Sequence, residues 1–420
     1  MKRTQGLAAL VLVGAIVSGC TSQAAAAAEA TSAATRATAA PSEASKAAVD
    51  MNAFGFDFYK AGLTSGDNAV VSPASILLAL SMARAGAAGQ TASQMDTVLH
   101  SPSPSKLNSL DQALAGLSGT FKDAAGAEHE VTLRIANAPF AQGGELFEQS
   151  FLDTLASQYG ASLRLVDFKA DSSGAVRDIN KWISDKTEAR IPQLLDKLDP
   201  ATRLVLVNAI YMKAPWLAPF YEDATEPAPF TRLDGSKVSV PTMNETVHDG
   251  LYASGADWQA VELPYAGGSL AMTIVVPQNL AAFEKTLSGT RFAEITGALE
   301  QTYISVSLPR FKVETKSELS ATLVKMGMPL AFDPGKADFS GITKQEPLYI
   351  GEVVHQANIS VDEKGTEASA ATAVVVMAGA APGPQPEPKV VHVDRPFIFA
   401  VRDTSTGAIL FLGRVVDPSV

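Results

Sequence analysis

Residues that could carry out catalysis are few and scattered in this chain of 420 residues. The sequence has one cysteine, Cys20, and five histidines, His100, His129, His248, His355 and His392. The histidines lack metal-ligand spacing, and one cysteine cannot form a cysteine-based zinc site. The signatures G-x-S-x-G, H-E-x-x-H, G-x-G-x-x-G and G-x-x-x-x-G-K-[ST] are missing as well. Folding could still assemble a catalytic triad, but the motifs favour a protein that is not an enzyme and needs no metal or cofactor.

The composition is that of a soluble globular protein, with 46% hydrophobic and 18% charged residues. The net charge of −11 at pH 7 disfavours nucleic acids and anionic membranes as partners, because both repel an acidic protein. Length alone would suggest two or three domains. The spacing of the motifs described below favours one, and we expect a monomer.

The N-terminus has the pattern of an export signal. Lys2 and Arg3 precede an apolar run at 7–17, which is short for a membrane span and fits a signal peptide. The run leads into Val-Ser-Gly-Cys20, which resembles the lipobox of bacterial lipoproteins, where the cysteine becomes the lipidated N-terminal residue. We therefore expect a lipoprotein signal peptide at 1–20 and an exported protein, anchored at the cell surface through Cys20 or extracellular.

The segment at 21–47 is dominated by alanine, serine and threonine. It has few large apolar side chains to offset the entropy lost on ordering, so we expect a flexible tether. The folded body is expected at 48–420. A fold exported with a single cysteine has no intramolecular disulfide and depends on packing alone.

Hydrophobic periodicity in the body alternates between helix and strand. It predicts helices at 47–63, after Ser72-Pro73 and at 172–187, buried strands at 131–140 and 203–214, and hairpins at 258–276 and 397–415. In the helix at 172–187, Val176, Ile179, Trp182 and Ile183 are candidates for the buried face. The elements follow no simple βαβ order, which predicts an α+β fold.

The stretch at 361–388 has the most unusual chemistry. It begins with small and polar residues, continues with Val-Val-Val-Met377, and then has a proline at every second position from Pro382 to Pro388. The first part could join a sheet, whereas proline lacks the backbone donor that a sheet needs. Between them, residues 377–381 are a natural cleavage site for a protease. A low-complexity surface loop is the simpler alternative, but it leaves the abrupt change at Pro382 unexplained.

Residue parity is compatible with this stretch entering a sheet. If it becomes a central strand with Glu367 facing solvent, every second residue faces inward. These inward residues are Thr366, Ala368, Ala370, Thr372, Val374 and Val376. None of them is charged or bulky, so burial of this face is physically acceptable.

Five blocks over residues 48–420 resemble the serpin family. The hinge Glu363-Lys-Gly-Thr-Glu-Ala-Ser-Ala-Ala-Thr372 is similar to that of inhibitory serpins, with Ser369 in place of a commoner alanine. The other blocks are Asn68-x3-Ser72-Pro-x-Ser75, Asn180-x-Trp182-x4-Thr187-x3-Ile191, Leu204-Val-Leu-Val-Asn208-x7-Trp216 and Asp394-Arg-Pro-Phe397 with Gly407-x5-Gly413. The resemblance implies a serpin fold, with about nine helices, three β-sheets and an exposed reactive-centre loop at 363–394.

The resemblance implies suicide inhibition of serine, and by extension cysteine, endopeptidases. The protease cuts the loop and becomes acylated by it, and the loop then inserts as an extra strand in a large sheet. Insertion distorts the protease before deacylation. Backbone hydrogen bonds and buried apolar side chains would drive insertion, so the uncut state persists for kinetic reasons.

The resemblance also assigns roles to residues. The hinge consists of Glu363, Gly365, Thr366, Glu367, Ala368, Ser369, Ala370, Ala371 and Thr372. Glu363 is expected to pair with Arg310, and the alternative is an exposed pair worth less than about 1 kcal/mol. The residues expected where the sheet opens are Ser72, Ser75, Asn208, His355, Trp216 and Arg310.

The reactive bond follows from the family's spacing, which makes Glu363 the seventeenth residue before the cut. This places the bond at Gly379–Ala380, and neighbouring bonds within Met377, Ala378 and Ala381 stay open as alternatives. The window contains no lysine or arginine, which disfavours trypsin-like proteases. We therefore expect an elastase-like or subtilisin-like endopeptidase as the partner.

Two other functions compete with inhibition. A non-inhibitory serpin could act as a surface binding or carrier protein, but such members usually have charged, bulky or proline residues at the hinge, and residues 365–373 have none of these apart from Glu367. A lipoprotein enzyme or solute-binding protein is disfavoured by the missing motifs and the five blocks.

Overall fold

The computed structural model describes residues 28–62, 66–100, 102–367 and 387–420. Nine α-helices lie in this part of the chain: α1 Pro41–Gly62, α2 Pro73–Arg84, α3 Gly89–Val98, α4 Pro104–Ala115, α5 Gln149–Thr154, α6 Ser172–Lys186, α7 Leu280–Thr286, α8 Gly289–Gly297 and α9 Ser320–Met326. None of them is long and apolar enough to cross a membrane.

The described strands form two hydrogen-bonded sheets. Sheet 1 has eight strands, in the order β1 Ala28–Ala30, β5 Leu163–Val166, β4 Glu128–Gln142, β6 Leu204–Pro215, β14 Gly365–Thr366, β13 Glu352–Asp362 and β12 Phe311–Glu318, with β3 Gly119–Lys122 beside β4. Sheet 2 has nine, in the order β15 Lys389–His392, β11 Glu300–Pro309, β8 Lys237–Ser254, β9 Trp258–Pro264, β10 Leu270–Pro277, β16 Phe397–Asp403, β17 Ile409–Val415 and β2 Ala69–Val71, with β7 Glu226–Thr231 beside β8.

The predicted α+β architecture is confirmed. The three sheets of the expected fold appear here as two hydrogen-bonded units, because the long strand β8 pairs with β7 at 237–242, with β11 at 242–252 and with β9 at 251–254. The predicted strand at 203–214 is β6, and its near-continuous apolar run is buried on both faces. The two predicted hairpins correspond to β9 with β10 and to β16 with β17.

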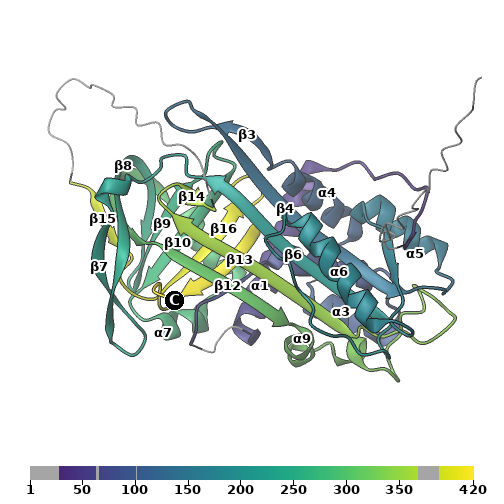
Figure 1. The fold of residues 1–420 in the computed structure, drawn as a ribbon. Coiled ribbons are helices and arrows are strands. Elements are labelled where there is room, and N and C mark those ends of the chain that lie inside the picture. The colour runs from purple at the N-terminus through teal and green to yellow at the C-terminus, as the bar shows by residue number, and fades with distance from the viewer. Residues whose placement is uncertain (1–27, 63–65, 101, 368–386) are drawn as a thin grey trace, which may run out of the picture.

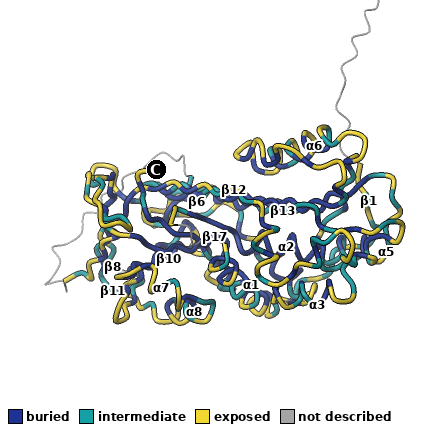
Figure 2. The backbone as a smooth tube through the Cα atoms, turned by 90° about the horizontal axis from the view of Figure 1, so that it is seen from below, coloured by how far each residue is buried: buried dark blue, intermediate teal, exposed yellow. Residues whose placement is uncertain are grey.

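Helices pack on both faces of sheet 1 around the first half of β6, which explains the burial of this part of the strand. Figure 2 shows α6 alone over one face, while α1, α2 and α3 lie on the other side. Under α6, a cluster of apolar side chains joins Val176, Ile179 and Ile183 to Val205 and Val207 of β6. The predicted buried face of this helix is therefore confirmed. Trp182 packs against the same cluster while remaining partly exposed.

The N-terminal segment differs from the flexible tether that the sequence predicts at 21–47. Its described part packs on the body, so the folded region begins by residue 28 instead of 48. Strand β1 pairs with the edge strand β5, with Glu29 opposite Arg164. Helix α1 then begins at Pro41, before the predicted start. Composition misled the prediction because an existing sheet edge supplies backbone partners even to a segment of small residues.

Arg36 fastens this segment to helix α4. Its Nε donates to Asn108 Oδ1 at 2.6 Å, and its Nη2 donates to Asp111 Oδ2 at 2.7 Å. Asn108 is buried, and the charged pair is about 30% exposed on each side. These contacts are stronger than a free surface pair because part of their surroundings is protein.

We expect Arg36→Ala to lower the free energy of unfolding by about 1–2 kcal/mol, because two charge-assisted hydrogen bonds are lost. The measurement is the urea midpoint of the first unfolding transition. Lys46→Ala is the matched control, because Lys46 belongs to an exposed pair with Glu43 in the adjacent helix. Equal midpoints for the two variants would contradict a structural role for Arg36.

Candidate functional site

The seam between β6 and β13 is the central feature of sheet 1 (Figure 1). These strands run parallel and pair directly from Glu352 opposite Val205 to Ala357 opposite Ile210. Beyond this point the short strand β14 lies between them, antiparallel to both. The seam is therefore closed at one end and already contains a third strand at the other.

Strand β14 consists of the predicted hinge residues Gly365 and Thr366. Thr366 lies opposite Ala214 on one side and Val361 on the other. An exposed loop was expected at 363–394, and this is wrong for Thr366, which is 1% exposed. The first inward residue is thus already seated, because a small β-branched side chain can be buried there without an unpaired charge.

Gly365 is required by the backbone at this position. Its φ is +144°, and a Cβ atom there would lie 2.2 Å from the carbonyl oxygen of Ala214. Only glycine accommodates both this conformation and the close approach of β6. The role of Gly365 in the present structure is a close backbone contact within the sheet.

The aromatic pair Trp216 and Tyr265 contacts the hinge residues that lie in the sheet. Trp216 follows β6 and stacks on Tyr265, with ring centroids 4.5 Å apart and planes 11° from parallel. The Tyr265 hydroxyl is hydrogen bonded to the Thr366 hydroxyl at 2.6 Å. Trp216 donates from its backbone nitrogen to Lys364 O and from Nε1 to Asp362 O, both at 2.9 Å. Trp216 therefore contacts the segment that links β13 to β14.

Glu363 forms the expected ion pair with Arg310. Both Arg310 Nε and Nη2 lie near one oxygen, Glu363 Oε1, at 2.7 and 2.6 Å. Thr225 Oγ1 donates to the same oxygen at 2.5 Å. Burial alone would raise the pKa of Glu363, but these hydrogen bonds outweigh it, so its pKa lies below its ordinary value. The alternative of an exposed pair does not apply to the carboxylate, which is 3% exposed.

Glu367 is the last described residue of the hinge, and it does not project freely into solvent. Its backbone nitrogen donates to Ser360 O at 3.0 Å, and its φ of +47° is unusual for a residue other than glycine. Its carboxylate lies 3.6 Å from Arg190 Nε, and burial raises its pKa. This residue is thus held in a strained conformation next to the occupied end of the seam.

A buried polar cluster crosses the paired part of the seam. His355 of β13 lies directly opposite Asn208 of β6, with His355 Nδ1 2.5 Å from Asn208 Oδ1. The backbone nitrogen of Ser72 donates to His355 Nε2 at 3.1 Å. Ser72 also caps α2 by accepting from Ser75 N at 3.1 Å, and these four residues are fully buried. The structure therefore brings together Ser72, Ser75, Asn208 and His355.

The partners of His355 require its neutral form. Nε2 must accept from Ser72, so the ring proton lies on Nδ1 and is donated to Asn208. Burial lowers the pKa of His355 to about 3, with the Asn208 hydrogen bond opposing this shift. A second proton would break the bond to Ser72, so this histidine has a structural role.

Trp216 and Arg310 lie apart from this cluster. The six residues predicted for sheet opening thus divide between the middle of the seam and the end occupied by β14. The family resemblance groups them because it carries no distances. Tyr265 and Thr225 also touch the hinge, and nothing in the sequence indicated them because neither belongs to a periodic pattern that would indicate such a contact.

The comparisons with known proteins agree with this architecture. The family model described as "Serpin (serine protease inhibitor)" matches residues 49–418. The chain belongs to the serpin family. It is 37% identical to an uncharacterized serpin-like protein of Thermococcus kodakarensis, over 88% of this chain and 85% of that one. It is 36% identical to leukocyte elastase inhibitor A of Rattus norvegicus, over 84% of this chain and 93% of that one.

A solved structure supports the same assignment. The crystal structure of tengpin, a thermophilic serpin in its native state, superposes with a TM-score of 0.80 at 30% identity. The match covers 93% of this chain and 99% of tengpin. The serpin fold therefore includes nearly the whole described chain.

Several predicted residues of this serpin lie outside the described residues. These are the hinge residues Ala368, Ser369, Ala370, Ala371 and Thr372, the reactive-bond residues Met377, Ala378, Gly379, Ala380 and Ala381, and the lipidation residue Cys20. Their roles remain predictions. The described part of the hinge ends at Glu367.

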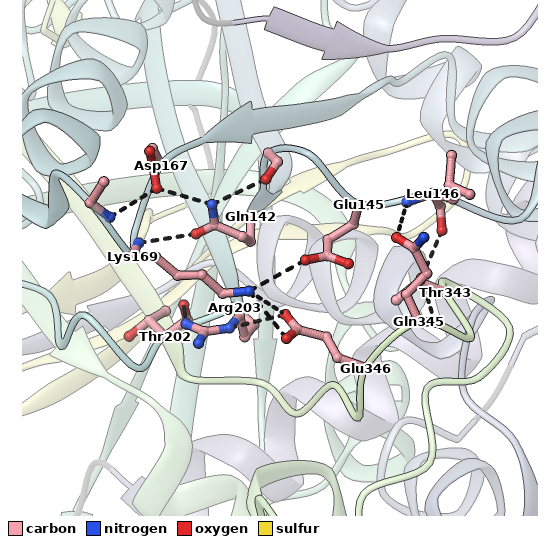
Figure 3. Close-up of polar contacts among 12 residues, drawn as sticks. Gln142, Glu145, Leu146, Asp167, Lys169, Thr202, Arg203, Thr343, Gln345 and Glu346 are labelled. Carbon is pink, nitrogen blue, oxygen red and sulfur yellow. Dashed lines mark hydrogen bonds and ion pairs between the residues drawn. The ribbon is translucent and has the colours of Figure 1, made fainter.

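The other end of the seam in this serpin carries a polar cluster that the sequence did not reveal (Figure 3). Lys169 Nζ lies 3.4 Å from Glu145 Oε1 and 3.2 Å from Glu346 Oε2, and Arg203 Nε lies 3.0 Å from Glu346 Oε1. Arg203 directly precedes β6, and Glu346 belongs to the segment that leads to β13. Each partly exposed pair contributes up to about 1 kcal/mol. Together they connect the two sides of the seam at its closed end.

We expect this serpin to lose stability in mild acid through His355. The unfolded histidine takes up a proton near pH 6.5, whereas the folded one resists protonation until about pH 3. Above pH 6.5 the histidine is neutral in both states and does not affect the free energy of unfolding. Below pH 6.5 the unfolded state binds the extra proton, so the free energy of unfolding falls by up to about 1.4 kcal/mol per pH unit. The measurement is the urea midpoint between pH 7 and pH 5. His355→Gln removes the titration, so the wild-type protein should show the steeper loss, and parallel slopes would contradict the assignment.

Proposed function

We propose that this serpin is a suicide inhibitor of endopeptidases whose cleaved loop becomes a complete strand of sheet 1. The observation that supports this proposal is the seated hinge between β6 and β13. Thr366 already occupies an inward position, and the residues that follow alternate in a way that keeps charges off the inward face. Insertion would extend an existing strand, so it would not need to nucleate a new one.

The chemistry would begin with the protease's own nucleophile. A serine Oγ attacks the carbonyl carbon of Gly379, the bond to Ala380 breaks, and the released amine of Ala380 takes the proton. An ester then joins Gly379 to the protease. As residues 368–379 enter the seam, the attached protease is carried along and distorted before water can cleave the ester. The loop supplies the acyl group, and the sheet supplies the free energy.

The proposed targets are proteases with small apolar specificity pockets, either elastase-like or subtilisin-like. The residues around Gly379 are alanine, glycine and methionine, so a pocket that requires a positive charge has no partner there. The similarity to a leukocyte elastase inhibitor supports the elastase-like class. The reactive bond itself is proposed from the spacing to Glu363.

We also propose export and anchoring through a lipid on Cys20, as in a bacterial lipoprotein. The support is the basic start, the apolar run and the cysteine after Val-Ser-Gly. Residues 1–20 would be the signal peptide, and the monomeric inhibitor domain would guard the cell surface. Incorporation of labelled palmitate in a bacterial host, absent from Cys20→Ala, is the corresponding measurement.

Incubation with an elastase-like and with a subtilisin-like protease should yield a covalent adduct that survives denaturing electrophoresis. We expect Thr366→Arg to lower the adduct fraction by at least about tenfold, because the position is buried against Tyr265 and the longer charged side chain would lose its hydration there. Ser93→Arg, on the exposed side of α3, is the control. Cleaved chain without adduct from the wild type would indicate a non-inhibitory binding protein instead. Efficient trapping by Thr366→Arg would contradict insertion.

Cleavage of the loop without trapping should raise the thermal midpoint steeply. Inserting residues 368–379 would complete the hydrogen-bond ladders of β6 and β13 and bury further side chains. The measurement is calorimetry of the intact protein and of protein nicked between residues 377 and 381 by a protease that is then removed. A nicked protein that melts at the same temperature as the intact one would rule out insertion as the driving force.

A further inference from the structure

A cavity lies beside Trp216, on the side of the molecule where sheet 1 meets sheet 2. It has a volume of about 490 Å³, within the range of small-molecule sites. Its walls come from the segment after β6, from β8 and β9, and from β11. This cavity lies next to the occupied end of the seam, and the inhibitory chemistry described above does not use it.

The walls of the cavity are mainly apolar. Trp216 and Phe220 form the side next to the hinge, and Leu251, Ile304 and Val306 contribute from sheet 2. Trp216, Ile304 and Val306 are buried, so these groups are held in place by the surrounding core. A flat apolar molecule would find aliphatic contacts here, from the partly exposed Leu217, Val247 and Leu251.

Two carboxylates also face this cavity, and they differ in their partners. Glu262 is neutralised, since Arg402 Nε and Nη2 donate to it at 2.8 and 2.9 Å and Thr273 Oγ1 donates at 2.6 Å. Glu245 accepts at Oε1 from the backbone nitrogen of Thr246 at 2.9 Å. Its Oε2 is buried without any hydrogen-bond donor among the described residues.

The unpaired oxygen of Glu245 determines what the cavity can accept. A buried carboxylate oxygen without a donor costs free energy, and a ligand that brings a donor recovers it. Burial raises the pKa of this carboxyl, and in the described part of the chain no basic side chain forms an ion pair with it. A cationic donor complements the site better than a neutral one, because charge-assisted hydrogen bonds are the stronger kind.

We propose that this cavity binds a small apolar molecule that carries one protonated amine, with the ammonium group at Glu245 Oε2. The apolar body of the ligand lies against the partly exposed lining residues Leu217, Val247 and Leu251. Trp216 is buried, with its ring stacked on Tyr265, and forms part of the wall behind the ligand. Glu245 is the specificity-determining residue, and Glu262 has no free oxygen for the same task.

The ligand site communicates with the hinge through Trp216 and Phe220. Trp216 donates to Asp362 O and Lys364 O, and the backbone nitrogen of Phe220 donates to Glu363 O at 2.9 Å. Trp216 and Phe220, which line the cavity, are thus hydrogen bonded to the segment before Thr366. By linkage, a ligand that prefers this arrangement binds less well when the hinge is displaced.

The test uses the full chain and a matched pair of probes, biphenylmethylamine and uncharged biphenylmethanol, titrated by calorimetry near pH 7. The wild type should bind the amine at least about tenfold more tightly than the alcohol. Glu245→Gln should remove this preference while leaving the affinity for the alcohol unchanged. Glu300→Gln, an exposed carboxylate on β11, changes the net charge equally and should leave both affinities unchanged.

Leu251→Trp gives a second variant that keeps Glu245 and fills the cavity. It should abolish binding of both probes with no loss of the folded state, monitored by its thermal midpoint. Equal affinity of the wild type for the two probes, or no binding of the amine, would overturn the proposal whether or not Glu245→Gln folds. Binding of the amine unaffected by Leu251→Trp would also overturn it, since the probe would then bind elsewhere.

Coupling to the hinge is tested with the same amine and needs no protease. Thr366→Arg displaces the seated hinge and should weaken amine binding by about fivefold. The exposed Ser93→Arg should have no effect. An unchanged affinity in Thr366→Arg would overturn the coupling. Because the readout is binding alone, failure here is distinguishable from failure of the inhibitory function.

Discussion

The hydrogen-bond ladder between β6 and β13 covers only part of their length, and the rest of the structure depends on this incomplete pairing. From Glu352 to Ala357 of β13, the two strands pair their backbone groups directly with each other. Further along β13, Gly365 and Thr366 lie between the two strands and pair with both of them. A sheet interior leaves few alternatives, because unpaired backbone groups away from water are costly. The hinge therefore supplies the missing backbone partners at this end of the seam. A longer inserted strand would continue the same pairing.

The same constraint explains why the residues around the seam are polar yet buried. His355 and Asn208 face each other across the two strands, and Ser72 reaches the pair from the start of α2. Each hydrogen bond joins elements that must separate or shift if a further strand enters. A neutral histidine suits this place because it both donates and accepts. Its two hydrogen bonds share one imidazole ring, so a shift of the ring disturbs both.

At the occupied end of the seam, aromatic packing replaces the polar cluster. Trp216 stacks on Tyr265, and Tyr265 bonds to Thr366, so the hinge rests on a rigid support. The other side of Trp216 borders the cavity that contains Glu245. One side chain thus contacts the sheet, the hinge and the cavity. The cavity is therefore in direct contact with the residue that supports the hinge.

The sequence by itself determined the fold class and most of the elements around the seam. The apolar run of β6 and the amphipathic pattern of α6 are local signals, because the period of the buried residues sets the secondary structure. The small inward residues after Glu363 likewise follow from alternation. Only the tertiary structure decided that Thr366 is already inside the sheet and that residues 28–47 pack on the body. It also decided which polar groups stay unpaired, as Glu245 does. These features arise from contacts between residues far apart in the chain, and no local pattern records which backbone edge or which cavity a segment will meet.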